Sequence, residues 1–177
     1  MFRTVDIKKY VLTAMCITLC IVLPQAFHFI PNFGAIFLPM HIPVLLCGLT
    51  CGAPFGFLCG VIGPLLSSVL TGMPPMAVLP SMMAQCAVYG AVSGILMKHC
   101  HVRNATANIY ISLITAMIAG RITAGVVQAF VYSTGENTLS AWITTNFITS
   151  FPGIVIQLII LPQIVYVLRR ASLVPAF

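Results

Sequence analysis

The scarcity of charge constrains this chain more than any other feature of its sequence. Only 6% of its residues are Asp, Glu, Lys or Arg, and 60% are hydrophobic. A soluble domain carries about 25% charged residues, because its surface must face water. With so few charges, the outside of this fold must face lipid instead. We therefore predict an integral membrane protein.

The length of the chain indicates how often it crosses the membrane. A helix needs about 20 residues to cross the roughly 30 Å hydrocarbon core. Six crossings with short loops use nearly all of the 177 residues. We predict a single all-α membrane domain over residues 1–177, a bundle of six transmembrane helices. The expected helices cover residues 10–28, 37–52, 55–70, 77–97, 109–132 and 147–168.

The basic residues indicate the orientation of this bundle. They precede the first expected helix, lie between the fourth and fifth, and follow the sixth, whereas the loops on the opposite side hold none. Loops rich in Lys and Arg stay in the cytoplasm, so both termini are expected to be cytoplasmic. The residues that follow this rule are Arg3, Lys8, Lys9, Lys98, Arg103, Arg169 and Arg170.

Arg121 is the exception, because it lies near the centre of the fifth expected helix. A charge at mid-membrane costs about 2.5–3.5 kcal/mol, so its guanidinium should face the bundle interior or a wet cavity. The two acids, Asp6 and Glu136, are expected at a terminus and in an outer loop. We expect the planar guanidinium to bind an anionic ligand. Capping of helix carbonyls and an ion pair with Glu136 are the alternatives.

Polar residues at helical spacing form a stripe on each of the last three expected helices, mostly toward the outer side. Polar groups in lipid usually turn inward, so three stripes could line a pocket. Hydrogen bonds between helices explain any one of these residues equally well. The stripes are Ser81, Gln85 and Tyr89; Arg121, Gly125, Gln128 and Tyr132; and Asn146, Thr149, Gly153 and Gln157.

Histidine and cysteine offer weaker candidates for binding. His28 and His41 flank the first outer loop, and each could contact a ligand or lie at the membrane interface. The seven cysteines form no CxxC pair, so we expect small apolar packing residues rather than metal ligands.

Glycines recur every fourth position, a pattern that lets helix backbones approach closely in lipid. They are Gly48, Gly52, Gly56 and Gly60, and then Gly90 and Gly94.

Motifs for several kinds of chemistry are absent from the sequence. It contains no GxxxxGK[ST] phosphate loop, no HExxH and no GxSxG. Two acids are too few for carboxylate-pair chemistry or an acidic proton relay. We therefore expect a protein that is not an enzyme, that binds no nucleic acid and that needs no cofactor or metal.

Four segments carry a resemblance to a known family, in order along nearly the whole chain. They are residues 37–48 (FLPMHIPVLLCG), residues 70–75 (LTGMPP), the pair Gly120 and Arg121, and residues 151–154 (FPGI) with Gln157. In these segments the chain resembles the substrate-binding (S) components of energy-coupling factor (ECF) transporters.

The resemblance implies a six-helix protein of the prokaryotic plasma membrane that captures a vitamin or related micronutrient outside the cell. Such a protein docks on one transmembrane coupling subunit and two ATPases, and ATP hydrolysis there makes it topple and release the substrate inside. Docking uses small residues of the first helix, here Ala14 and Thr18. An autonomous permease that works without an ATPase is the alternative.

The family pocket lies between the outer halves of helices four to six and the loops after helices one and three. Carried over to this chain, it implies that eight residues bind the substrate. Arg121 favours a substrate with a carboxylate, similar to pantothenate or folate. The eight residues are Arg121, Gln128, Gln85, Tyr89, His41, Asn146, Gln157 and Met73.

Overall fold

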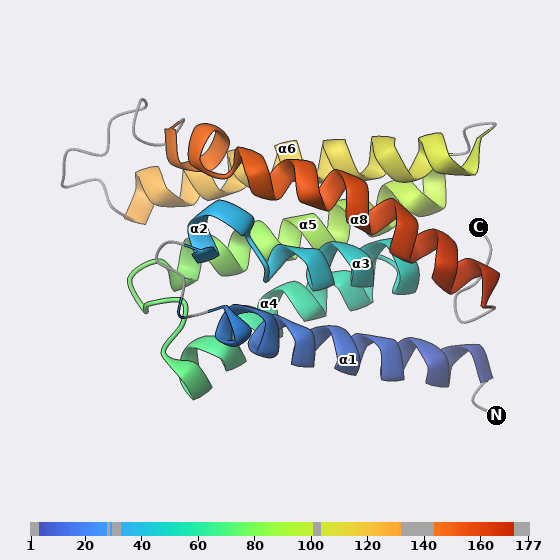
Figure 1. Ribbon diagram of the computed structural model, residues 1–177, viewed down its shortest axis with the longest axis horizontal. Coiled ribbons are helices and arrows are strands. Elements are labelled where there is room, and N and C mark those ends of the chain that lie inside the picture. The colour runs from blue at the N-terminus through green and yellow to red at the C-terminus, as the bar shows by residue number, and fades with distance from the viewer. Residues whose placement is uncertain (1–3, 28, 30–32, 101–103, 132–143, 172–177) are drawn as a thin grey trace.

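In the computed structural model the chain forms a bundle of helices (Figure 1). The structure describes residues 4–27, 29, 33–100, 104–131 and 144–171, and all of their regular secondary structure is helical. This confirms the all-α prediction. The elements are α1 (Thr4–Ala26), α2 (Phe33–Phe37), α3 (His41–Cys51), α4 (Ala53–Thr71), α5 (Leu79–His99), α6 (Ala105–Val131), the π-helix η1 (Thr144–Thr149) and α8 (Phe151–Arg170).

Five helices of the described part, namely α1, α4, α5, α6 and α8, are long and apolar enough to cross a membrane. The remaining apolar helix, α3, has only 11 residues. At a rise of 1.5 Å per residue it spans about half of the hydrocarbon core. The structure therefore supports a multi-pass membrane protein, and the count of six crossings stays a prediction.

The backbone around Leu38 explains why α3 is shorter than the expected helix over residues 37–52. Leu38 has a φ of 50°, which is uncommon for a residue with a side chain. It also precedes Pro39, and the proline ring disfavours the helical conformation in the residue before it. The chain therefore breaks between α2 and α3. At the other end Gly52, with a φ of 96°, makes a tight turn into α4.

Successive helices run in alternating directions along the bundle (Figure 1). The amino end of α1 and the carboxyl ends of α5 and α8 consequently lie at the same end (Figure 1). Lys8 and Lys9 belong to the first turns of α1, Lys98 to the last turn of α5, and Arg169 and Arg170 to the last turn of α8. We name this the basic end of the bundle, and it matches the charge pattern read from the sequence.

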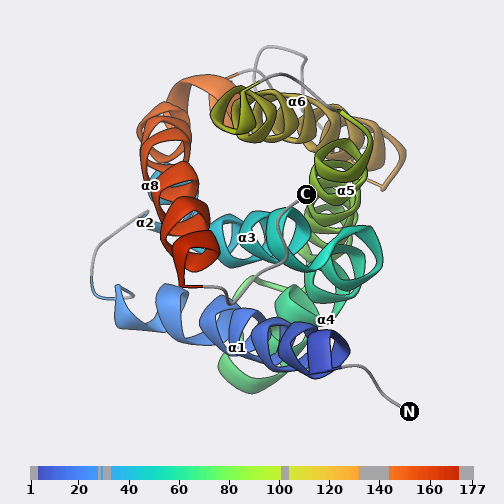
Figure 2. The ribbon, with the colours of Figure 1, turned by 90° about the vertical axis from the view of Figure 1, so that its right-hand side faces the viewer.

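Helix α3 lies at the centre, between α8 and α5, with α1 and α4 beside it (Figure 2). The glycines explain how α4 and α5 come so close. A Cβ atom on Gly90 would collide with the backbone of Gly56, and one on Gly60 would collide with the backbone at Cys86. The prediction that small residues allow close backbone approach is confirmed for this pair of helices.

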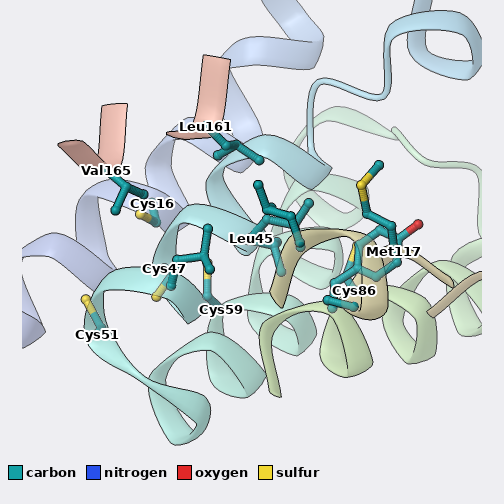
Figure 3. Close-up of a cluster of buried hydrophobic side chains, with 14 of the residues drawn as sticks. Cys16, Leu45, Cys47, Cys51, Cys59, Cys86, Met117, Leu161 and Val165 are labelled. Atoms are coloured by element: carbon teal, nitrogen blue, oxygen red, sulfur yellow. The ribbon is translucent and has the colours of Figure 1, made fainter. Parts of the chain in front are cut away.

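Six of the seven cysteines are buried. Cys16, Cys47 and Cys59 bring α1, α3 and α4 together in one apolar core, which also contains Leu161 and Val165 of α8 (Figure 3). Their burial among apolar side chains agrees with the expectation that they act as small packing residues.

Candidate functional site

The buried guanidinium of Arg121 connects α6 to α5 and to the residue that precedes α8. Arg121 is 2% exposed, so the prediction that it faces the interior is confirmed. Its Nη1 donates a hydrogen bond to the hydroxyl oxygen of Tyr89 on α5, at 3.1 Å, and its Nη2 donates one to Oγ of Ser150, just before α8, at 3.5 Å. The charged side chain of α6 is thus held by neutral hydroxyl groups from α5 and from the segment that leads into α8.

Tyr89 connects Arg121 to further polar side chains. Its hydroxyl oxygen also accepts a hydrogen bond of 2.9 Å from Nε2 of Gln85, one turn earlier on α5. The Tyr89 ring is fully buried, and its centroid lies 5.1 Å from that of the His41 ring, at an interplanar angle of 59°. We call the set of buried polar residues gathered here the polar cluster: Arg121, Tyr89, Gln85, His41, Ser150 and Gln157.

Gly120 provides the space that the Tyr89 ring needs. A Cβ atom at Gly120 would collide with two carbons of that ring and would lie 3.0 Å from the backbone oxygen of Gln85. The absence of a side chain therefore lets Tyr89 lie against α6, with its hydroxyl group beside the next residue, Arg121. In the Gly120–Arg121 pair, Gly120 leaves space for the Tyr89 ring, and Arg121 donates the hydrogen bond to the Tyr89 hydroxyl.

His41 and Gln157 meet at the strained backbone of Leu38. The Leu38 carbonyl accepts a hydrogen bond of 3.0 Å from the His41 backbone N–H and one of 3.4 Å from Nε2 of Gln157. His41 is 1% exposed and Gln157 is 0% exposed. Among the described residues, neither ring nitrogen of His41 nor Oε1 of Gln157 has a hydrogen-bond partner. The Gln85 side chain and the Leu38 carbonyl face the imidazole, but not in hydrogen-bonding geometry.

The polar cluster lies from the middle of the bundle toward the end opposite the basic end. His41 begins α3, Gln85 lies in the first half of α5, Gln157 lies in the first half of α8 and Arg121 lies in the second half of α6. Because the helices alternate in direction (Figure 1), these positions fall in the same part of the molecule. Some members of each stripe therefore lie in the same part of the molecule, namely Gln85, Tyr89, Arg121 and Gln157, and the bond from Arg121 to Tyr89 joins two of the helices.

Not every predicted site residue joins the polar cluster. Gln128 is half-buried further along α6, and Met73 is half-buried after α4, where its backbone bonds to Thr71 and Ser67. No hydrogen bond joins either side chain to the cluster in the part of the chain that the structure describes. The side chain of Asn146, like His28, Tyr132 and Glu136, lies outside the described residues.

The predicted polar stripe of the last helix includes Thr149 but not Ser150. Thr149 is exposed, whereas Ser150 is buried and bonds to Arg121. The π-helix η1 ends at Thr149, and its wider turns change which residue faces inward. The spacing contained a signal, because Ser150 lies four residues after Asn146 and seven before Gln157, which places all three on one helix face.

The proposed docking residues lie on the outer surface of α1. Ala14 and Thr18 are both exposed. Oγ1 of Thr18 donates a hydrogen bond of 3.0 Å to the backbone oxygen of Ala14, so the hydroxyl is satisfied within its own helix. A shallow apolar groove of about 430 Å³ runs over this face, and it is lined by Val11, Ala14, Met15, Thr18 and Leu19.

Comparison with known proteins gives one finding. A family model described as "ECF transporter, substrate-specific component" matches residues 8–165. The match includes every residue of the polar cluster and of the α1 groove. No curated protein and no solved structure matches the chain.

Proposed function

The chain belongs to the family of ECF transporter substrate-specific components, and from that premise we propose that it captures an anionic micronutrient outside the cell at Arg121. It releases this substrate inside by toppling when it is docked on the ATP-driven module. The family is one of substrate-specific transporter subunits, and this supports substrate binding as the role of the polar cluster.

The buried Arg121 carries this proposal. A guanidinium inside a membrane bundle is costly, and sites that bind carboxylates often use this planar group. Two of its hydrogen bonds go to the neutral hydroxyls of Tyr89 and Ser150. A carboxylate adds a full negative charge and can accept two parallel N–H···O bonds from one guanidinium, which a neutral hydroxyl cannot do. A ligand carboxylate can therefore replace these hydroxyls and gain affinity from the exchange.

The position of the polar cluster supports the direction of capture. It lies away from the basic end, and basic segments stay in the cytoplasm. Both termini are therefore proposed to be cytoplasmic, with α2 and α3 together completing the sixth crossing of a prokaryotic plasma membrane. A carboxylate-bearing substrate similar to pantothenate or folate fits the charge of Arg121.

The groove on α1 is the proposed docking surface for the coupling module, made of one transmembrane subunit and two ATPases. Its lining is apolar except for Thr18, whose hydroxyl is already bonded. Small residues such as Ala14 let another helix approach closely within a membrane.

Equilibrium binding to the purified protein tests the proposed site. We would titrate a panel of carboxylate-bearing vitamins that includes pantothenate and folate, and we expect one member to bind. Arg121→Ala should weaken its binding at least tenfold, and Arg121→Lys should restore it only in part because it lacks the planar fork. Arg170→Ala removes an exposed arginine and serves as the matched control, with unchanged affinity. Equal affinity in the Arg121→Ala variant would remove Arg121 from the site.

The alternative of an autonomous permease makes the opposite prediction about transport. It requires substrate flux into liposomes that contain this chain alone. Our proposal predicts no flux until the coupling subunit, the ATPases and ATP are added.

A further inference from the structure

We infer that His41 and Gln157 form a second subsite, beside Arg121, that binds an uncharged amide or hydroxyl group of the ligand. This inference rests on the proposed function and adds the chemistry of the ligand's uncharged part. We call His41, Gln157 and the Leu38 carbonyl together the neutral subsite.

Three polar atoms of the neutral subsite are buried without a hydrogen bond among the described residues. They are Nδ1 and Nε2 of His41 and Oε1 of Gln157. Most buried polar atoms in folded proteins have a partner, and a buried atom without one destabilises the fold. Three such atoms on two residues joined to the same carbonyl indicate groups that are kept for a ligand.

The backbone at the neutral subsite is strained as well. Leu38, whose carbonyl bonds to both His41 and Gln157, has a φ of 50°. Strained conformations persist where the surroundings hold them, and they often occur at ligand sites. Gly153 contributes to this arrangement, because a Cβ there would lie 2.6 Å from the backbone oxygen of Ile36. Its small size lets α8 bring Gln157 up to the α2–α3 connection.

Tyr89 links the neutral subsite to Arg121. The His41 ring packs on the ring of Tyr89, and the Tyr89 hydroxyl binds Arg121. A single small ligand can thus touch both subsites, with its carboxylate at Arg121 and its uncharged group at His41 and Gln157.

The atoms left for a ligand define the chemistry of its uncharged group. Oε1 of Gln157 can only accept, so the ligand must present an N–H or O–H group to it. A neutral imidazole offers one donor and one acceptor, so the same ligand group should also accept a hydrogen bond. Secondary amides and hydroxyls meet both conditions, whereas a ketone, an ether or an alkyl chain does not. The ligand class is therefore a small carboxylate that carries an amide or hydroxyl group near the carboxylate.

Matched pairs of small carboxylates test this inference. N-acetylglycine and 4-oxopentanoate differ only in that the N–H of the first is a CH₂ in the second, and N-acetyl-β-alanine and 5-oxohexanoate form the same pair with one more carbon. Affinities come from the dependence of the unfolding midpoint on probe concentration. In at least one pair we expect the amide to bind about threefold to tenfold more tightly, as one hydrogen bond provides.

Variants of two glutamines of α8 complete the test. Gln157→Leu should abolish the preference for the amide, because it weakens binding of the amide more than binding of the ketone. Gln163→Leu changes an exposed glutamine of the same helix and should keep the preference. Equal affinities within both pairs in the wild-type protein, or a preference that survives in Gln157→Leu, would overturn the inference. The wild-type comparison decides the matter even where Gln157→Leu fails to fold.

The same measurements separate this inference from the proposed function. If amide and ketone bind equally well to the wild type and neither binds to Arg121→Ala, the result supports the anion site at Arg121 and overturns only the neutral subsite. Binding of none of the four probes overturns the neutral subsite, and a vitamin panel that also fails to bind overturns the proposed function.

Discussion

Gly120 is the residue on which the contact between Tyr89 and Arg121 depends. Substitution by alanine places a methyl group where the Tyr89 ring lies, and the ring must then move away from Arg121. Overpacking of this kind costs about 1–3 kcal/mol, so we expect Gly120→Ala to lower the thermal unfolding midpoint by several degrees. Ligand affinity should fall with it, as measured by equilibrium titration.

Gly34→Ala is the matched control for this prediction, because a Cβ atom at Gly34 meets nothing within 4 Å. It adds the same methyl group to another helix and should leave both the unfolding midpoint and the affinity unchanged. If Gly120→Ala has the stability and the ligand affinity of the wild type, then neither property depends on the position of the Tyr89 ring.

At the residue scale the sequence predicts which side chains turn inward better than it predicts their partners. The cost of a charge in lipid was enough to place Arg121 in the interior, and spacing was enough to place Gln85 and Tyr89 on one buried face. The bonds from Arg121 to Tyr89 and Ser150 depend on how three helices are rotated. That rotation follows from tertiary packing and from η1, and neither can be read from spacing.

At the scale of elements, α1 presents the surface on which assembly with the coupling module depends. Ala14→Trp should fill the shallow groove and prevent that helix from approaching a partner, while the polar cluster on other helices stays intact. We expect loss of co-purification with the coupling module and an unchanged ligand affinity. Ile122→Trp places the same side chain on the exposed surface of α6 and should assemble normally. Normal assembly of Ala14→Trp would move the docking surface elsewhere.

The element that sequence reasoning described least well is the one that helps build the site. The sequence predicts a single helix over residues 37–52, whereas in the structure α3 begins only at His41 and the short helix α2 ends at Phe37. The Leu38–Pro39 step carried a local signal, because a residue before proline avoids the helical region. The proline at position 43 does not break α3, since the first turn of a helix has no backbone bond for it to remove.

At the scale of the whole molecule, the orientation can be tested through Cys100. This residue follows α5 at the basic end and is partly exposed, whereas the other six cysteines are buried. A membrane-impermeant maleimide should therefore label Cys100 in inside-out vesicles but not in intact cells, and Cys100→Ser should remove the label. Labelling of Cys100 in intact cells would place the basic end outside and reverse the proposed direction of capture.

Capture of an anionic small molecule by the polar cluster is tested most directly by native mass spectrometry of the protein purified from cells. We predict a population heavier than the bare chain by the mass of one small carboxylate. The same population should be present in Arg170→Ala and absent from Arg121→Ala. A wild-type protein that carries no adduct even after addition of the vitamin panel, or an adduct that Arg121→Ala retains in full, would contradict this account.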